Sequence, residues 1–404
     1  MSKSLIKLRT VYGRGVNFLG QLGLNNKYQS AEQFTAIPGL IRVESKSIHS
    51  SYAQSMCLLE SGELLMWGWP LDVRSQMQVI QILNMNPRLA KFMQRYSPLP
   101  WISLREGVDY PEKEPSGVSP FEEVVFGGAF VVARDSEGRG YVWGNNHRGQ
   151  CGSGDFIPAS IPKMVESLLD KYLVKCAAGY QHSMFLSHDG EVFASGRVGN
   201  YAYGKVPLTA VTYKACTKHF IQVGIDGIVD LAGGQNHSLF INEYGKVYAV
   251  GKNEFGQCGQ ISTQKFVQEP KEVYLPEKAV SIACGTKHSL VLGESGTLYA
   301  FGCKIHGQLN GFRGGNEEDQ SSALPVELPS TGKVVNIFAG FDRSGVILDN
   351  NEVWVWGGHD YRYLDGEFYE KMTMLNNLIP GQLEEDIVEL ALGYMHTLVM
   401  TSTH

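Results

Sequence analysis

Residues 231–259 read LAGGQNHSLFINEYGKVYAVGKNEFGQCG, and the local signals in this stretch recur along the rest of the chain. A turn of small residues leads to the pair His237-Ser238 and a short apolar run. A turn at Tyr244-Gly245 follows, and then residues 246–251 (KVYAVG), which are rich in β-branched and aromatic side chains. Apolar runs of this length between glycine turns predict two antiparallel strands.

Each half of this stretch has six further copies. The first half is a Gly-x-x-His-Ser/Thr motif; its intact copies contain His182, His237, His288 and His396, and its degraded copies begin at Ser51, Gly127 and Gly340. The second half is a strand that ends in glycine, at Gly13, Gly68, Gly144, Gly196, Gly251, Gly302 and Gly357. The residue before that glycine is Trp67, Trp143 or Trp356 in three copies. The glycines are 55, 76, 52, 55, 51 and 55 residues apart, which predicts a repeat architecture.

The order of the halves predicts a closed ring. The chain begins with a second half and ends with a first half, so we expect the strand at residues 7–13 to complete the blade that residues 388–401 begin. Such pairing removes an open sheet edge. The predicted fold class is therefore all-β: one domain, residues 1–404, folded as a seven-bladed β-propeller of repeats of about 50 residues.

The combined motif resembles the repeat of the regulator of chromosome condensation family, whose members are seven-bladed propellers. The resemblance rests on Gly-x-x-His-Ser, the Trp-Gly strand end and the Asn-x-x-Gly-Gln turn that follows, and it covers Lys7 to Thr401 apart from one insertion. It implies guanine-nucleotide exchange on a small GTPase. It also implies that each repeat histidine and tryptophan is structural, with the histidine supporting its own blade through hydrogen bonds to the backbone.

The insertion at residues 69–120, which we place between two blades, differs from the repeats. Asn86-Pro87 is a helix start with an N-cap and a proline at the first helical position, and basic and apolar side chains then alternate at helical spacing as far as Pro98. The candidate partner-docking residues are Arg88, Lys91, Phe92, Arg95, Tyr96 and Trp101. Two interpretations remain open: a basic amphipathic helix that docks a protein or an anionic lipid surface, and a helix that covers the side of its own propeller.

Composition narrows the class of protein. The net charge is −6 and there is no basic block, so direct nucleic-acid binding is not expected. No apolar run reaches the length of a membrane span, although peripheral contact with a membrane stays open. The seven cysteines form no Cys-x-x-Cys pair, which favours free thiols in a reducing compartment.

The composition of the N-terminal residues bears on where in the cell the protein is located. The first 31 residues hold no Asp or Glu but five Lys or Arg, as mitochondrial transit segments do. The prediction is a mitochondrial protein. The alternative is a cytoplasmic or nuclear protein in which these cations decorate an exposed strand.

No catalytic, cofactor-binding or metal-binding constellation is predicted. The stretch Gly199–Val206 is one residue short of a phosphate-binding loop, with Val206 where Ser or Thr would hold Mg²⁺, and it coincides with a repeat turn. The repeat histidines lie on different blades. The predicted function is therefore a non-enzymatic protein-interaction scaffold, a subunit or assembly factor of a larger complex. The alternative is a guanine-nucleotide exchange factor for a small GTPase.

Overall fold

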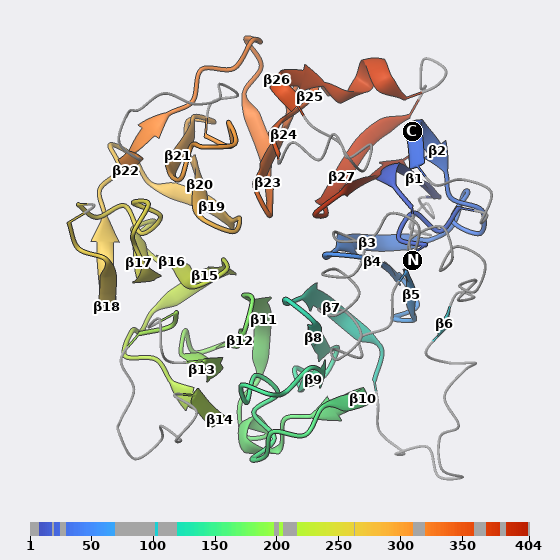
Figure 1. Cartoon of the computed structure of the whole chain (residues 1–404). Coiled ribbons are helices and arrows are strands. Elements are labelled where there is room, and N and C mark those ends of the chain that lie inside the picture. The colour runs from blue at the N-terminus through green and yellow to red at the C-terminus, as the bar shows by residue number, and fades with distance from the viewer. Residues whose placement is uncertain are drawn as a thin grey trace, which may run out of the picture.

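A computed structural model of the chain describes residues 8–17, 20–24, 30–68, 102–103, 119–197, 202–204, 216–261, 263–309, 320–358, 369–379 and 385–402. These residues form seven four-stranded antiparallel sheets arranged as blades around a central axis (Figure 1). The predicted seven-bladed propeller is therefore confirmed.

Within each blade the strands follow one another outward from the axis, except in the last blade. Blade 1 contains β3 (Ser45–Ser50), β4 (Gln54–Leu59), β5 (Leu64–Gly68) and β6 (Ile102–Ser103); blade 2 contains β7 (Phe121–Phe126), β8 (Phe130–Asp135), β9 (Gly140–Gly144) and β10 (Ala159–Met164). Blade 3 contains β11 (Leu173–Ala178), β12 (His182–Ser187), β13 (Val192–Arg197) and β14 (Cys216–Gln222); blade 4 contains β15 (Ile228–Gly233), β16 (His237–Asn242), β17 (Val247–Lys252) and β18 (Phe266–Val273). Blade 5 contains β19 (Ala279–Cys284), β20 (His288–Gly293), β21 (Leu298–Gly302) and β22 (Gln320–Pro325); blade 6 contains β23 (Val334–Gly340), β24 (Arg343–Leu348), β25 (Val353–Gly357) and β26 (Tyr369–Met374). Blade 7 contains β27 (Asp386–Leu392), β28 (His396–Ser402), β1 (Arg9–Val16) and β2 (Ser30–Ala36).

Blade 7 closes the ring with strands from both ends of the chain (Figure 1). Strand β1 pairs antiparallel with β28 from Arg9↔Ser402 to Gly15↔His396, and β2 adds the outer strand. The predicted ring closure is confirmed. β1 is hydrogen-bonded to β28 on one side and to β2 on the other. Without β1, the edge of β28 would be left unpaired.

The terminal glycine of β1 is Gly15 rather than the predicted Gly13. Gly15 lies opposite His396, as Gly251 lies opposite His237 in blade 4. Its φ of 107° is close to the 120° of Gly251, while Gly13 has no positive φ. The Tyr-Gly pair at residues 12–13 imitates the strand end in sequence, but the strand continues for three more residues.

Each innermost strand contains a bulge at the same place. In blade 4 the register between β15 and β16 shifts between Ile228 and Asp230, so Val229 is the extra residue. The equivalent extra residues are Lys46, Glu122, Val174, Val280, Val335 and Val388. The side chains before and after the bulge therefore occupy repeated positions in all seven blades.

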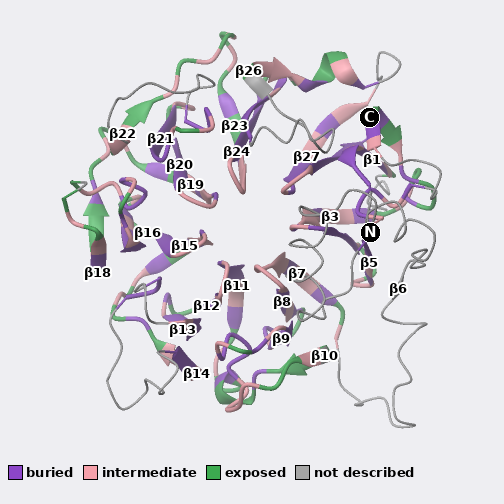
Figure 2. Cartoon of the chain, in the orientation of Figure 1, coloured by how far each residue is buried: buried purple, intermediate pink, exposed green. Residues whose placement is uncertain are grey.

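Blades pack face to face through apolar clusters that cross from one blade to the next. One cluster joins Leu239 and Val247 of blade 4 to Ile282 and Val291 of blade 5. The middle strands are mostly buried, whereas half of the residues in outer strands such as β18 and β22 are exposed (Figure 2). Stability of the ring therefore depends on the contacts between blades as well as on each sheet.

The insertion supplies part of blade 1. Strand β6 lies within residues 69–120 and pairs with β5 through Leu65↔Ser103 and Met66↔Ile102. The predicted helix that starts at Asn86-Pro87 lies outside the described residues. Within the described residues the helical elements are the 3₁₀ turns η1 (Glu166–Leu168) and η3 (Leu375–Leu378). Among these residues there is no helix of the length and apolarity that a membrane crossing requires.

Candidate functional site

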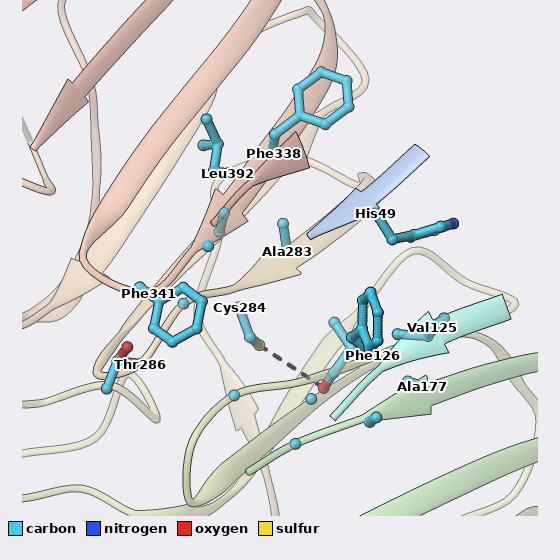
Figure 3. Close-up of a pocket in the computed structure, with 18 of the residues that line it drawn as sticks. His49, Val125, Phe126, Ala177, Ala283, Cys284, Thr286, Phe338, Phe341 and Leu392 are labelled. Atoms are coloured by element: carbon cyan, nitrogen blue, oxygen red, sulfur yellow. Dashed lines mark hydrogen bonds between the residues drawn. The ribbon is translucent and has the colours of Figure 1, made fainter. Parts of the chain in front are cut away.

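A cavity of about 620 Å³ runs along the propeller axis. Its walls come from the innermost strands and the Gly-x-x-His loops of all seven blades, and Figure 3 shows side chains from several of them, including His49, Phe126, Cys284 and Phe338. Most wall positions carry small or apolar residues. The charged groups in the wall include Glu123, Lys175 and Glu389.

Three aromatic rings gather at the end of the cavity formed by the Gly-x-x-His loops. Tyr52 stacks on Tyr394 with 4.0 Å between ring centroids, and Phe341 meets both rings edge-on at 5.3 and 5.2 Å. Burial raises the pKa of both tyrosines, so both phenols are neutral. Phe341 adopts a φ of 52°, a conformation that a bulky residue rarely takes. These three rings come from blades 1, 6 and 7 and form an apolar rim.

In blades 2, 3, 4 and 7 the first position after the bulge carries a charged residue, and those of blades 2, 3 and 7 line the cavity. The Glu123 carboxylate of blade 2 accepts hydrogen bonds from Cys176 N of blade 3 at 2.8 Å and from Arg134 Nε at 3.3 Å. Lys175 of blade 3 forms an ion pair with Asp230 of blade 4. These contacts link each blade to its neighbour, so the charged groups of blades 2 to 4 have partners within the protein.

Glu389 is the equivalent carboxyl group of blade 7 and has a different environment. Its Oε2 accepts a hydrogen bond from Ile48 N of blade 1 at 3.2 Å. Burial raises the pKa of Glu389 to about 8, although the Ile48 N–H and the charge of Arg9 lower it in part. The group is therefore a largely neutral acid at pH 7, at the junction where the ring closes.

The repeat histidines join neighbouring blades. The Nε2 atoms of His182, His237 and His288 each lie 3.0 Å from a serine hydroxyl of the next blade, and that of His396 lies 2.9 Å from one; the serines are Ser238, Ser289, Ser344 and Ser55. This geometry corrects the expectation that each histidine bonds to the backbone of its own blade. Ser238, Ser289 and Thr397, which follow His237, His288 and His396, are in turn contacted by the side chain at the histidine position of the preceding blade.

The direction of these bonds follows from the serine hydroxyls. Each has a single proton, and each lies within 2.8 Å of a backbone carbonyl oxygen in the preceding blade's turn; these oxygens belong to Ala202, Gln257, Gln308 and Gln21. A carbonyl can only accept, so the hydroxyl donates to it and the imidazole Nε2–H donates to the hydroxyl. Burial lowers the pKa of His237 to about 4 and those of His182, His288 and His396 to about 3, so all four rings are neutral.

A histidine 3.0 Å from a serine hydroxyl resembles a nucleophile and its base, but the proton positions exclude that chemistry at the His237–Ser289 pair. A base must present a lone pair to the hydroxyl, whereas Nε2 carries the proton. His237 and Ser289 are also fully buried, so no substrate reaches them. The described residues hold no group of three or more His, Cys, Asp or Glu that could bind a metal ion.

The glycine of each Gly-x-x-His motif is required for a steric reason, which the spacing of the motifs along the sequence does not show. A Cβ on Gly179, Gly234 or Gly285 would lie 2.0–2.1 Å from the histidine Cε1 atom of its own motif, and one on Gly393 would lie 2.5 Å away. In blade 2 the ring is Phe130, and a Cβ on Gly127 would lie 2.1 Å from it. The glycine therefore makes room for a ring packed flat over the loop.

Three blades lack the histidine: Gln54 takes its place in blade 1, and blades 6 and 2 keep the contact with the next blade by other means. In blade 6 the Arg343 Nη1 donates to Thr397 Oγ1 of blade 7 at 2.8 Å, and its Nη2 donates to Tyr394 O at 2.9 Å. In blade 2 the buried Phe130 packs against blade 3 instead. Arginine thus preserves the link to the next blade, and phenylalanine exchanges it for apolar contact.

The three repeat tryptophans are buried between blades. Trp67 Nε1 donates to Gln21 O at 3.0 Å and Trp356 Nε1 donates to Gln308 O at 2.9 Å, the same carbonyls that receive a serine hydroxyl. Trp143 stacks against Phe121 with 6.1 Å between centroids. The six predicted partner-docking residues of the insertion, Arg88, Lys91, Phe92, Arg95, Tyr96 and Trp101, lie outside the described residues.

Comparison with known proteins identifies the repeats. Models of the "Regulator of chromosome condensation (RCC1) repeat" match residues 137–186 and 244–292, and residues 228–257 and 279–308. The chain is 26% identical over 237 residues to the ultraviolet-B receptor UVR8 of Arabidopsis thaliana, covering 58% of this chain and 52% of that protein. It is 28% identical over 260 residues to the guanine nucleotide exchange factor SRM1 of Saccharomyces cerevisiae, covering 58% and 52%. The chain thus spans about half the length of the curated relatives that it matches.

Solved structures share the fold over almost the whole chain. Yeast RCC1 (Prp20), in its complex with Kap60, superposes with a TM-score of 0.78 at 20% identity, covering 100% of this chain and 95% of that one. Human WBSCR16 superposes with a TM-score of 0.70 at 17% identity, covering 98% and 99%. At these identities the structural similarity concerns the fold alone.

Proposed function

We propose, from the premise that this chain is a seven-bladed propeller of RCC1-type repeats, that it is a non-catalytic scaffold that binds other proteins within a larger complex. The observation that supports this proposal is the use of the repeat side chains. The His–Ser pairs, the tryptophans and the motif glycines all serve contacts between blades, and the Ser–His geometry leaves no nucleophile at these pairs. The surface of this rigid disc is left for recognition, and recognition elements usually lie on the surface loops of such rigid scaffolds. Yeast RCC1 (Prp20), which shares this fold, was solved bound to Kap60.

Affinity purification of the tagged chain from its source cell, followed by quantitative mass spectrometry, tests this proposal. We expect one or a few proteins in near-stoichiometric amounts, retained when GTP or GDP is added. A chain that purifies alone under mild salt, with its fold intact by circular dichroism, would contradict the scaffold role.

Guanine-nucleotide exchange is a second candidate, supported by the similarity to the exchange factor SRM1. A solved neighbour, Prp20p, is described together with its binding to Gsp1p and histones. An exchange factor weakens nucleotide binding, and by linkage the nucleotide weakens binding of the factor. Added GDP would therefore dissolve an exchange complex and leave a scaffold complex intact. Faster release of a fluorescent GDP from a small GTPase of the same cell, at micromolar concentrations of this chain, would favour exchange.

The insertion remains a candidate docking element, and the structure changes how it is tested. A deletion across the insertion would also remove β6, the outer strand of blade 1. Charge reversal at Arg88, Lys91 and Arg95 avoids this problem. We expect it to release the partner if the segment docks one, and to leave binding unchanged if the segment covers its own propeller.

For location we propose the nucleus or the cytoplasm, the alternative of the sequence analysis. Support comes from the matches to RCC1 repeats and to an exchange factor, and the comparisons add none for mitochondrial import. A C-terminal fluorescent fusion imaged with a mitochondrial dye distinguishes these locations.

A further inference from the structure

At one end of the ring the same hairpin arrangement is repeated in neighbouring blades. In each of blades 4 to 6 the hairpin between the second and third strands folds back beside the start of the innermost strand. Glu243 N donates to Gly227 O at 3.0 Å, Glu294 N donates to Lys278 O at 2.9 Å, and Asp349 N donates to Lys333 O at 2.9 Å. We call this end of the propeller the hairpin face. The hairpin tips and the bulges of the innermost strands therefore lie on the same side.

The bulge residues of these three blades are exposed valines. Val229, Val280 and Val335 are 56%, 55% and 47% exposed, and they occupy the same position in consecutive blades. The innermost strands of the three blades, β15, β19 and β23, lie next to one another around the axis (Figure 1). Three adjacent valines at half exposure form an apolar arc along the inner rim of the hairpin face, and burying them would be favourable.

The hairpin tips outside this arc are acidic. Glu243, Glu294 and Asp349 are all exposed. Glu277 and Glu352 lie beside them: burial raises the pKa of Glu277, but hydrogen bonds from Ser295 and Tyr299 lower it further, so this carboxyl stays ionised. Hydrogen bonds also lower the pKa of Glu352.

The basic residues on the same side do not cancel these charges. Lys278 and Lys333 precede the innermost strands, and Lys246 is paired with Glu272 at 3.0 Å. On the opposite face the same blades present Lys252, Lys287 and Lys304, of which Lys252 is paired with Glu254 at 2.7 Å. The two faces of blades 4 to 6 therefore differ in charge, and the hairpin face is the acidic one.

We propose that Val229, Val280, Val335, Glu243, Glu294 and Asp349 form a docking surface, the valine–acid arc, for a basic segment of a partner protein that also carries apolar side chains. This inference rests on the proposed scaffold function and specifies its surface. The apolar side chains would pack on the valines, and the Lys or Arg side chains would pair with the hairpin carboxylates. Other occupants fit less well, because nucleic acids, anionic lipid surfaces and a second copy of this acidic face would all be repelled.

Two triple variants test the arc, each with a matched control. The first is E243K/E294K/D349K, and its control is E32K/E254K/E269K, which changes the net charge equally at exposed carboxylates off the hairpin face. The second is V229S/V280S/V335S, and its control is I261S/I305S/L324S, at residues that are 73%, 53% and 51% exposed elsewhere. The probe is a fluorescein-labelled amphipathic peptide of leucine and lysine, followed by anisotropy at several salt concentrations.

We expect the charge reversal on the arc to weaken binding of the peptide about tenfold or more and to flatten its salt dependence, and its control to weaken binding less than about threefold. We expect the serine variant to weaken binding about fivefold with the salt dependence retained. Equal losses in arc variants and controls would overturn the inference, because net charge or general stickiness would then explain binding. Affinity purification of the same variants separates the two proposals. If a stoichiometric partner still binds both arc variants, the docking surface is wrong and the scaffold function stands. If no partner is recovered with any variant or with the wild type, the scaffold function is wrong, and the peptide assay alone decides whether the arc binds basic segments.

Discussion

His288 Nε2 in blade 5 lies 3.0 Å from Ser344 Oγ in blade 6, and that hydroxyl lies 2.7 Å from the carbonyl oxygen of Gln308. Trp356 Nε1 donates to the same carbonyl at 2.9 Å. One backbone oxygen in the turn of blade 5 thus receives two donors from blade 6. The repeat motif therefore connects neighbouring blades. We expect its loss to weaken the packing between blades more than the hydrogen bonding within one sheet.

Ser344→Ala tests this connection. The change removes the acceptor of the His288 Nε2–H and leaves that donor buried, while Gln308 O keeps Trp356 as a partner. A buried donor left without a partner costs about 1–3 kcal/mol. We expect the free energy of unfolding in urea to fall by about that amount. The exposed Ser322→Ala is the control, and a Ser344→Ala variant as stable as this control would refute the link.

Gly234→Ala tests the steric role of the motif glycine. Its φ is not positive, so alanine adds no backbone strain, but the new Cβ would lie 2.1 Å from His237 Cε1 and 2.8 Å from Gly285 O. We expect a loss of about 2–4 kcal/mol in the free energy of unfolding from overpacking. Gly224→Ala is the matched control, because a Cβ there meets nothing within 4 Å, and it should be neutral or slightly stabilising.

A double-mutant cycle identifies the cause of that loss. If the clash with the ring dominates, Gly234→Ala combined with His237→Ala will cost less than the sum of the two single changes. Additive losses would show that the strain lies in the backbone contact with Gly285 instead.

The repeat period and the order of the two half-repeats were sufficient to predict the fold and its closure. Seven strand-ending glycines and a half-repeat at each end of the chain leave few alternatives to a ring. The position of the closing glycine was missed because Tyr12-Gly13 matches the motif in sequence, whereas hydrogen-bond register selects Gly15. Register between strands that are far apart in the chain is a tertiary property and leaves little local signal.

The direction of the histidine contacts could not be predicted either. A Gly-x-x-His-Ser motif shows that histidine and serine are adjacent in sequence, but their hydroxyl–imidazole bonds join residues 52 to 56 positions apart in His182, His237 and His288. Those distances equal the repeat length, which was the available signal. The valine–acid arc was missed for a similar reason, because an exposed valine at one bulge carries little information until the sheet order aligns it with two more.

The buried histidines predict acid sensitivity. Burial lowers the pKa of His237 and His49 to about 4 and those of His182, His288 and His396 to about 3. The unfolded chain takes up these protons below pH ~6.5 and the folded chain does not, so stability is present above that pH and is lost as the pH falls towards 4. We expect each histidine to lower the free energy of unfolding by on the order of 1 kcal/mol per pH unit as the pH falls from ~6.5 to ~5.

Urea unfolding at several pH values measures that loss, and His237→Gln identifies its source. Glutamine can still donate to Ser289 Oγ but does not titrate, so the variant should lose less stability than the wild type between pH ~6.5 and ~5. The exposed His188→Gln should follow the wild type. A His237→Gln variant with an unchanged pH dependence would show that this ring takes up its proton as readily in the folded chain as in the unfolded chain.

Glu389 acts in the opposite direction and gives the last prediction. Burial raises its pKa to about 8, above the value of about 4.5 in the unfolded chain. Its contribution is fully present below pH ~4.5 and is lost as the pH rises through ~8, because the unfolded chain releases a proton that the folded chain holds. A glutamine in its place would keep an acceptor for Ile48 N without titrating, so Glu389→Gln should be increasingly more stable than the wild type from pH ~5.5 to ~8, by up to about 1.4 kcal/mol per pH unit. The histidine losses are common to both proteins and cancel in this difference, and the exposed Glu327→Gln should show no such trend. A constant difference across this range would mean that Glu389 is ionised in the folded protein, and that the carboxylate at the closing junction is balanced by Arg9 rather than held neutral by burial.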